Sequence, residues 1–420
     1  MVRNTGWLLA GKAVGAVLSL VYLALAARTL GPAQFGQFTL ILGTAQAATG
    51  LVGFQTWQIA VRFGPAHLGA GRDDALRRLV AFCTAVDMAA AVAGCAVLLA
   101  GYTLLGPLIG WPEETARPAL LFCIVALLSV RSTPVGVLRL YNRFGVGAAA
   151  DAVTAVVRFA GALAVVATGG SLRGFLLAWG IAEVATAAGY WLSVAVVAPR
   201  ALAVPRWRWY REMVAENPGL WRVSWFTNIT YTLETGTRQG VLLLVGLVVG
   251  AAGAGQYRVA SQLSQAVVRV SEMFSRAAFA EMTRAADRSD DAFARLLRQS
   301  SRLTVVAGLV VAAVLAVAGR PALALLAGPG FQDSYPVLML LGVAAVLEFA
   351  GAPFEPALVA RGMAGLAFRI RAASALCLLV ALAALLPALG TVGAGLAVLL
   401  SSAVALVLLA GAVFRDFRAA

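Results

Sequence analysis

Six polar residues between Arg258 and Arg276 have the spacing of one helical face. Arg258, Gln262, Gln265, Arg269, Glu272 and Arg276 follow one another at steps of 4, 3, 4, 3 and 4, the rhythm of side chains stacked along a helix. Such a helix extends roughly 27 Å, close to the roughly 30 Å hydrocarbon thickness of a bilayer. Arginine stays charged even when poorly solvated, and its fork of donors matches phosphate oxygens. The stripe could therefore hold a phosphate-bearing anion inside a membrane.

Further polar residues lie inside other apolar runs. In residues 220–248, Asn228, Tyr231 and Arg238 follow the same helical rhythm. Charged groups inside a membrane are costly and usually functional. The predicted substrate-binding residues are Lys12, Arg131, Arg158, Asn228, Tyr231, Arg238, Gln262, Gln265, Arg269 and Arg276.

Acidic residues share these apolar runs. A carboxyl group in a membrane interior can bind and release a proton near neutral pH, so Asp87, Glu183, Glu234, Glu272 and Glu348 are the predicted coupling residues. The alternative is that acids and bases pair privately and only hold helices together, as Arg269 and Glu272 could. Because cations and anions occur in eight separate apolar segments, the set favours a hydrated cavity.

Membrane-spanning helices must position these side chains. Apolar residues make up 61% of the 420 positions and charged residues 12%, unlike a soluble protein. The sequence predicts an all-α polytopic membrane protein. Its twelve transmembrane helices are expected at about residues 6–28, 36–56, 79–100, 118–138, 148–168, 173–197, 220–248, 254–281, 301–319, 336–358, 365–388 and 391–413.

The connections between these segments alternate in charge, and arginines gather in every second one. Basic loops mark the cytoplasmic side, so both termini are expected in the cytoplasm. The net charge of +14 is then a feature of membrane topology, and no nucleic acid is expected as a partner. Residues 255–281 could instead lie flat on the membrane, but Arg361, Arg369 and Arg371 would then face outward. Spanning is therefore favoured.

The chain also shows signs of an internal repeat. LGPAQFGQF at residues 30–38 and VGAAGAGQY at residues 249–257 share Gly, Ala, Gly and Gln at an offset of 219, which also relates Pro134 to Pro353. We therefore expect two six-helix lobes around a central cavity, at residues 1–200 and 220–420, joined by a basic cytoplasmic linker at 201–219. Duplicated transporters bind substrate between such halves.

Metal and cofactor chemistry receives little support from the sequence. The four cysteines lack the CxxC spacing of metal sites, and the chain has a single histidine. No metal site and no cofactor are predicted.

Two stretches resemble a known family. Residues 3–40 contain Ala27, Arg28, Leu30, Gly31, Pro32, Phe35, Gly36 and Phe38 in an A-R-x-L-G-P-x-x-F-G-x-F pattern, and residues 245–263 read VGLVVGAAGAGQYRVASQL. Both are similar to Wzx-like polysaccharide-transport flippases of the multidrug/oligosaccharidyl-lipid/polysaccharide exporter superfamily.

The resemblance implies a bacterial inner-membrane flippase rather than an enzyme. Its cargo would be a polyprenyl-pyrophosphate-linked oligosaccharide, moved to the outer leaflet by alternating access for surface polysaccharide or lipopolysaccharide biosynthesis. Implied partners are this lipid-linked oligosaccharide, membrane lipids and a coupling proton or sodium ion, with the protein a monomer or bound to polysaccharide assembly machinery. The alternatives are a cation-coupled multidrug-type exporter of small molecules and a membrane enzyme such as a polysaccharide polymerase or ligase.

Overall fold

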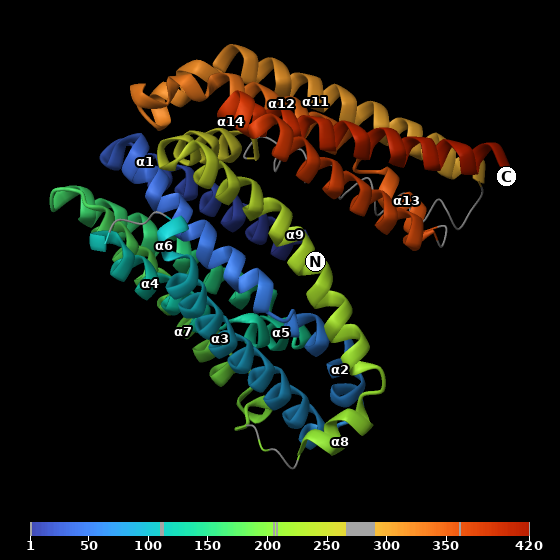
Figure 1. The fold of residues 1–420 in the computed structure, drawn as a ribbon. Helices are drawn as coiled ribbons and strands as arrows, with labels where there is room; N and C mark the ends of the chain where they lie inside the picture. Colours follow the sequence, from blue (N-terminus) through green and yellow to red (C-terminus); the bar gives the residue numbers. More distant parts are fainter. Residues whose placement is uncertain are drawn as a thin grey trace. The chain divides into compact units, whose positions relative to one another are not determined.

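The computed structural model describes residues 2–109, 113–204, 206, 209–265, 290–360 and 363–419. Within these ranges the regular structure is helical (Figure 1). Seven stretches are long and apolar enough to cross a bilayer. This confirms the all-α, polytopic membrane class, while the total of twelve spans stays a prediction.

The described part of the first half of the chain contains seven long or short α-helices before the linker: α1 (Val2–Val52), α2 (Thr56–Gly69), α3 (Asp73–Ile109), α4 (Glu113–Leu128), α5 (Ser132–Leu140), α6 (Phe144–Ala167) and α7 (Leu172–Val197). The short helices η1 (Pro199–Ala201) and α8 (Trp209–Glu216) lead into α9 (Leu220–Val249).

The second half begins with a helical stretch at residues 251–265. It continues through α11 (Asp290–Leu326), η2 (Pro329–Ser334), α12 (Tyr335–Gly351), α13 (Phe354–Ala360) and α14 (Ala364–Ala419).

Two long helices contain glycine breaks. The 51 residues of α1 would extend roughly 77 Å if straight, more than twice the thickness of a bilayer. The helical path is interrupted at Gly31 (φ 68°, ψ 174°), and α14 is interrupted in the same way at Gly390 (φ 58°, ψ −137°). Only glycine adopts such positive φ angles readily. The predicted pairs 6–28 with 36–56 and 365–388 with 391–413 therefore meet at a sharp break instead of an extended loop.

Two predicted spans are divided in the structure. The sequence predicts one helix over 118–138 and one over 336–358, but non-helical residues 129–131 separate α4 from α5, and residues 352–353 separate α12 from α13. Pro134 and Pro353 lie close to these breaks. Proline lacks the N–H that a helix interior requires, whereas the first turn tolerates it.

The packing divides the chain into two compact units. The first comprises Met1–Leu30 and Gln37–Leu243, and the second comprises Gly31–Gly36 and Leu244–Ala420. Most of α9 therefore packs with the first unit. The predicted lobes at 1–200 and 220–420 with a linker at 201–219 stay a prediction, because packing does not reveal which helices arose by duplication.

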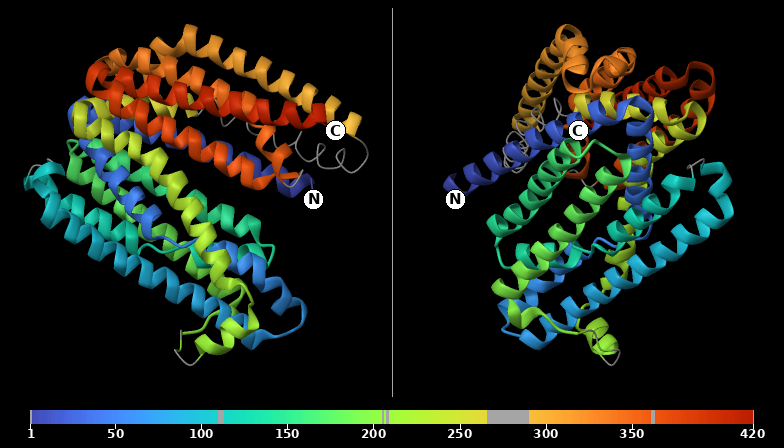
Figure 2. Two further views of the ribbon diagram at one scale, coloured as in Figure 1. Left: turned by 45° about the vertical axis from the view of Figure 1, so that its right-hand side comes forward. Right: turned by 90° about the vertical axis from the view of Figure 1, so that its left-hand side faces the viewer.

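The segment before α9 is anchored within the first unit. In Figure 2, α8 lies at the end of this unit against the start of α3. Met213 of α8 is buried with Ile59, Leu79 and Leu220, and Arg78 of α3 pairs with Glu216. The end of the predicted linker is thus packed against α3.

Close approach of α2 and α5 requires a glycine. A Cβ atom added at Gly136 would lie 2.7 Å from Trp57 Cα and 2.9 Å from Ala60 Cβ. Trp57 Cα belongs to the backbone of α2, so it could make room for the added Cβ only if α2 itself shifted.

We expect Gly136→Ala to lower the melting temperature of the detergent-solubilised protein by several degrees. Forcing extra volume into a packed contact typically costs about 1–3 kcal/mol. The matched control is Gly189→Ala on α7, where an added Cβ meets no atom within 4 Å and the helix gains in propensity. Equal melting temperatures for the two variants, measured by intrinsic fluorescence, would contradict the tight α2–α5 contact.

Candidate functional site

The first unit contains an open cavity of about 610 Å³, within the size range of small-molecule sites. Residues of α1 to α7, of α9, and of the segments between α1 and α2 and between α4 and α5 line it. Its polar lining consists of Gln46, Thr49, Gln55, Asp87, Ser129, Arg131, Ser132, Asp151, Thr154, Arg158, Glu183, Tyr190, Tyr231, Thr235, Arg238 and Gln239.

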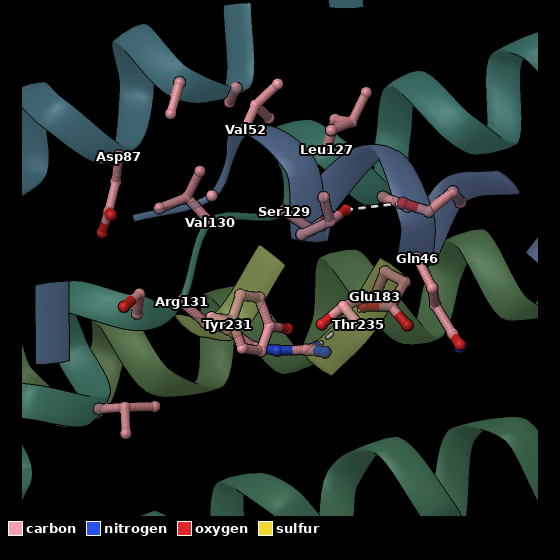
Figure 3. Close-up of a pocket in the computed structure, with 18 of the residues that line it drawn as sticks. Gln46, Val52, Asp87, Leu127, Ser129, Val130, Arg131, Glu183, Tyr231 and Thr235 are labelled. Carbon is pink, nitrogen blue, oxygen red and sulfur yellow. Dashed lines mark hydrogen bonds and ion pairs between the residues drawn. The ribbon is translucent and has the colours of Figure 1, made fainter. Parts of the chain in front are cut away.

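Glu183 of α7 binds two arginines within this cavity. Arg131 Nη1 donates to Glu183 Oε2 at 2.8 Å, and Arg158 Nη2 donates to Glu183 Oε1 at 2.6 Å. Figure 3 shows the Arg131 side chain extending toward Glu183 beside the ring of Tyr231, with Asp87 apart from them. Two guanidinium groups and one carboxylate leave a formal charge of +1 on this triad.

The two arginines have different surroundings. Arg158 lies inside α6, with its guanidinium 5.9 Å from the ring centre of Tyr22 and 5.6 Å from that of Trp179. Such contacts favour a cation over an aromatic face. Arg131 instead lies in the non-helical segment before α5. Its side chain is 42% exposed, compared with 18% for Arg158.

The aromatic packing behind Arg158 fixes α7. Trp179 is almost fully buried and makes edge-to-face contacts with Tyr22 and Phe38, each at 5.2 Å between ring centres. Trp179 precedes Glu183 by four residues, one helical turn along the same face. The apolar core of the unit therefore sets the position of the carboxylate.

Asp87 of α3 makes a separate polar cluster. Its Oδ2 accepts hydrogen bonds from the Thr133 amide at 3.0 Å and from Thr133 Oγ1 at 2.6 Å, and Thr56 Oγ1 lies 2.9 Å from both carboxylate oxygens. Thr56 begins α2, and Thr133 lies in the first turn of α5. One buried carboxylate thus serves the N-termini of two helices, where unpaired N–H groups favour negative charge.

Polar contacts hold α9 against the second part of α1. Asn228 Nδ2 donates to the Gly53 carbonyl at 3.2 Å, Thr232 Oγ1 to the Gly50 carbonyl at 2.9 Å, and Gln239 Nε2 to Gln46 Oε1 at 2.7 Å. The neighbouring face of α9 lines the cavity with Tyr231, Thr235 and Arg238.

The family model for polysaccharide biosynthesis proteins matches residues 1–286. The chain belongs to this family. It is 26% identical over 342 residues to the inner membrane protein YghQ of Escherichia coli (strain K12), an alignment that covers 80% of this chain and 95% of that protein. With seven described stretches long and apolar enough to cross a bilayer, this family member is a multi-pass membrane protein.

Solved structures share the fold. An inward-facing multidrug resistance MATE family transporter of the MOP superfamily superposes with a TM-score of 0.74 at 14% identity, over 96% of this chain and 94% of that one. The lipid II flippase MurJ in an inward closed conformation gives 0.71 at 11% identity, over 97% and 87%. At these identities the likeness shows that this chain shares its fold with both proteins.

The structure brings six of the predicted residues of this family member into the cavity. These are Asp87, Arg131, Arg158, Glu183, Tyr231 and Arg238. Asn228 lies outside the lining and donates to the carbonyl of Gly53, the residue that follows α1. Gln262, Gln265 and Glu348 lie in the second unit, where Gln265 donates to Ser261 Oγ at 3.1 Å and Glu348 accepts from Ser402 Oγ at 3.0 Å.

The side chains of five predicted residues lie outside the described part of the chain. Arg269, Glu272 and Arg276 lie outside the described residues. Lys12 belongs to α1 and Glu234 to α9, but the description covers the backbone alone at both positions.

Other lining residues were absent from the predicted site. Asp151 and Thr154 line the cavity together with Arg158, and their spacing of 3 and 4 residues was a usable signal. Trp179 carries no such signal, because its contact with Arg158 depends on how distant helices pack.

We expect Asp87→Ala to lower the melting temperature clearly, since each buried donor left without its acceptor costs about 1–3 kcal/mol. The control is Asp74→Ala, which removes an 84% exposed carboxylate from the same helix and should shift the transition little. Thermal unfolding of the purified proteins compares them. An unchanged transition for Asp87→Ala would show that the carboxylate does not hold α2 and α5.

Proposed function

We propose that the protein is a flippase for a polyprenyl-pyrophosphate-linked oligosaccharide. It would move this lipid from the cytoplasmic to the outer leaflet of the inner membrane by alternating access, for surface polysaccharide biosynthesis. The observation that carries the proposal is the convergence of Arg131 and Arg158 on Glu183 in a polar cavity of a polysaccharide biosynthesis family member.

The cavity lining suits each part of such a headgroup. Guanidinium groups bind phosphate oxygens through paired donors. Gln46, Gln55, Thr235 and Gln239 supply amide and hydroxyl groups, the usual partners of sugar hydroxyls. The polyprenyl chain would stay in the bilayer while the headgroup crosses through the protein.

The wider architecture belongs to the same proposal. Twelve spans would form two lobes, with both termini in the cytoplasm as the basic loops indicate. Lys12, Arg269 and Arg276 would add further cations along the path. A proton or sodium ion would couple transport through the acidic residues, and the polysaccharide assembly machinery would receive the product.

One observation favours a second function, a cation-coupled exporter of small molecules. The fold is also that of a MATE transporter, and the lining includes the carboxylates Asp87 and Asp151. Both carboxylates, however, accept hydrogen bonds from protein groups, Asp87 from Thr133 and Asp151 from the Tyr190 hydroxyl at 2.6 Å. Arg131 and Arg158 share one carboxylate and carry a net positive charge with it, so an anionic cargo fits better.

The test is transport by the purified protein in liposomes. A fluorescent polyprenyl-diphosphate disaccharide should become accessible to the membrane-impermeant quencher dithionite, and Arg131→Ala and Arg158→Ala should each slow this at least about tenfold, the loss of roughly 1.4 kcal/mol of binding. Arg173→Ala is the matched control, because Arg173 lies on α7 outside the cavity lining and donates to the Glu114 carbonyl. Ethidium transport without lipid movement would favour the exporter.

A further inference from the structure

Glu183 makes one contact with each arginine and leaves most of their donors unused. Its two oxygens separately accept Arg131 Nη1 and Arg158 Nη2. Among the described residues, Arg131 makes no other hydrogen bond, and Arg158 Nε is buried without a partner. A guanidinium has five N–H donors and binds anions best through two at once. An anion with more oxygens than a carboxylate could therefore bind both arginines more completely.

The pair is built so that one arginine can move and the other is held. Arg158 lies within α6 beside the rings of Tyr22 and Trp179, and its Nη1 lies 3.5 Å from the Tyr22 hydroxyl. Arg131 lies in the break between α4 and α5, with backbone angles of φ −138° and ψ −1°. Its side chain is the more exposed of the two. Exchange of partners would therefore occur at Arg131.

The other carboxylates that line the cavity bond to different groups. Asp87 accepts from Thr133 and contacts Thr56, and Asp151 accepts from Tyr190. Among the described residues, Glu183 is thus the acidic lining residue that binds Arg131 and Arg158. Its side chain is only 12% exposed, so its charge is poorly solvated and depends on them.

We propose that Glu183 is an internal competitor for the diphosphate of the substrate. In the empty cavity it neutralises part of the charge on Arg131 and Arg158, because two guanidinium groups without a counter-ion in a poorly solvated site would destabilise the protein. An incoming diphosphate displaces Glu183 from Arg131 and takes its place, and Glu183 returns when the substrate leaves. This exchange limits affinity and speeds release. The inference rests on the proposed function.

The decisive variant is Glu183→Gln, which keeps the shape of the side chain and removes its charge. Binding of farnesyl diphosphate to the full-length, detergent-solubilised protein should become about tenfold tighter, or about 1.4 kcal/mol. Flipping of the fluorescent lipid, measured under saturating substrate, should become slower because release is slower. If Glu183 had only a structural role, Glu183→Gln would weaken the binding of farnesyl diphosphate and also slow flipping. Glu355→Gln is the matched control, since it breaks a contact with Arg371 outside this cavity.

Two further variants keep the test informative if Glu183→Gln unfolds. Glu183→Asp keeps the charge but shortens its reach, and should tighten binding by a smaller factor. Adding Arg131→Ala to either variant should abolish the gain, because the released arginine is then missing. A gain that persists without Arg131 overturns the exchange.

Ligand controls separate the chemical sources. If the protein recognises the diphosphate alone, Glu183→Gln should bind both inorganic pyrophosphate and farnesyl diphosphate more tightly than the wild type does. If the lipid is also required, only farnesyl diphosphate should bind more tightly. Either result supports the exchange, whereas an equal gain for farnesol overturns it. Unchanged or weaker diphosphate binding by a folded Glu183→Gln, with wild-type flipping intact, overturns the inference and leaves the proposed function standing. A wild-type protein that neither binds farnesyl diphosphate nor moves the labelled lipid overturns both.

Discussion

The Glu183 carboxylate lies between two guanidinium groups in a chain made almost entirely of apolar helices, and this ionic contact organises the first unit. Charges removed from water carry a desolvation cost that only close partners offset. Arg131, Arg158 and Glu183 come from three parts of the chain, so their contact requires α6, α7 and the segment before α5 to meet. The aromatic cluster around Trp179 supplies the apolar packing that holds this arrangement.

The irregular backbone serves the same arrangement. In a membrane, non-helical backbone is tolerated where protein or a water-filled cavity surrounds it, and residues 129–131 line the cavity. Asp87 stabilises this break by binding the first turn of α5 and the start of α2. Gly31 and Gly250, which the proposed repeat relates, both have positive φ angles of 68° and 94°. The shared local geometry favours an internal repeat.

Fold and chemistry contribute different parts of the functional argument. Transporters with the same fold include a multidrug resistance protein and a lipid II flippase, so the fold does not choose between cargoes. The cavity lining bears on that choice. Arg131 and Arg158 share a single carboxylate, whereas Asp87 and Asp151 are engaged by hydroxyl groups and a backbone amide. This arrangement favours an anionic headgroup in a family of polysaccharide biosynthesis proteins.

The sequence by itself determined the membrane class, most helix positions and which residues share a helical face. Asp151, Thr154 and Arg158 line one cavity, as do Tyr231, Thr235 and Arg238, because both the spacing of polar residues and the helical turn are local properties. Only the tertiary structure decided that Glu183 binds Arg131, 52 residues away, and Arg158, 25 residues away. The contacts of Asp87 and the division of α4 from α5 were likewise decided by packing. The physical reason is that ionic and hydrogen-bonded partners are chosen by which helices lie side by side, and helical periodicity carries no information about that.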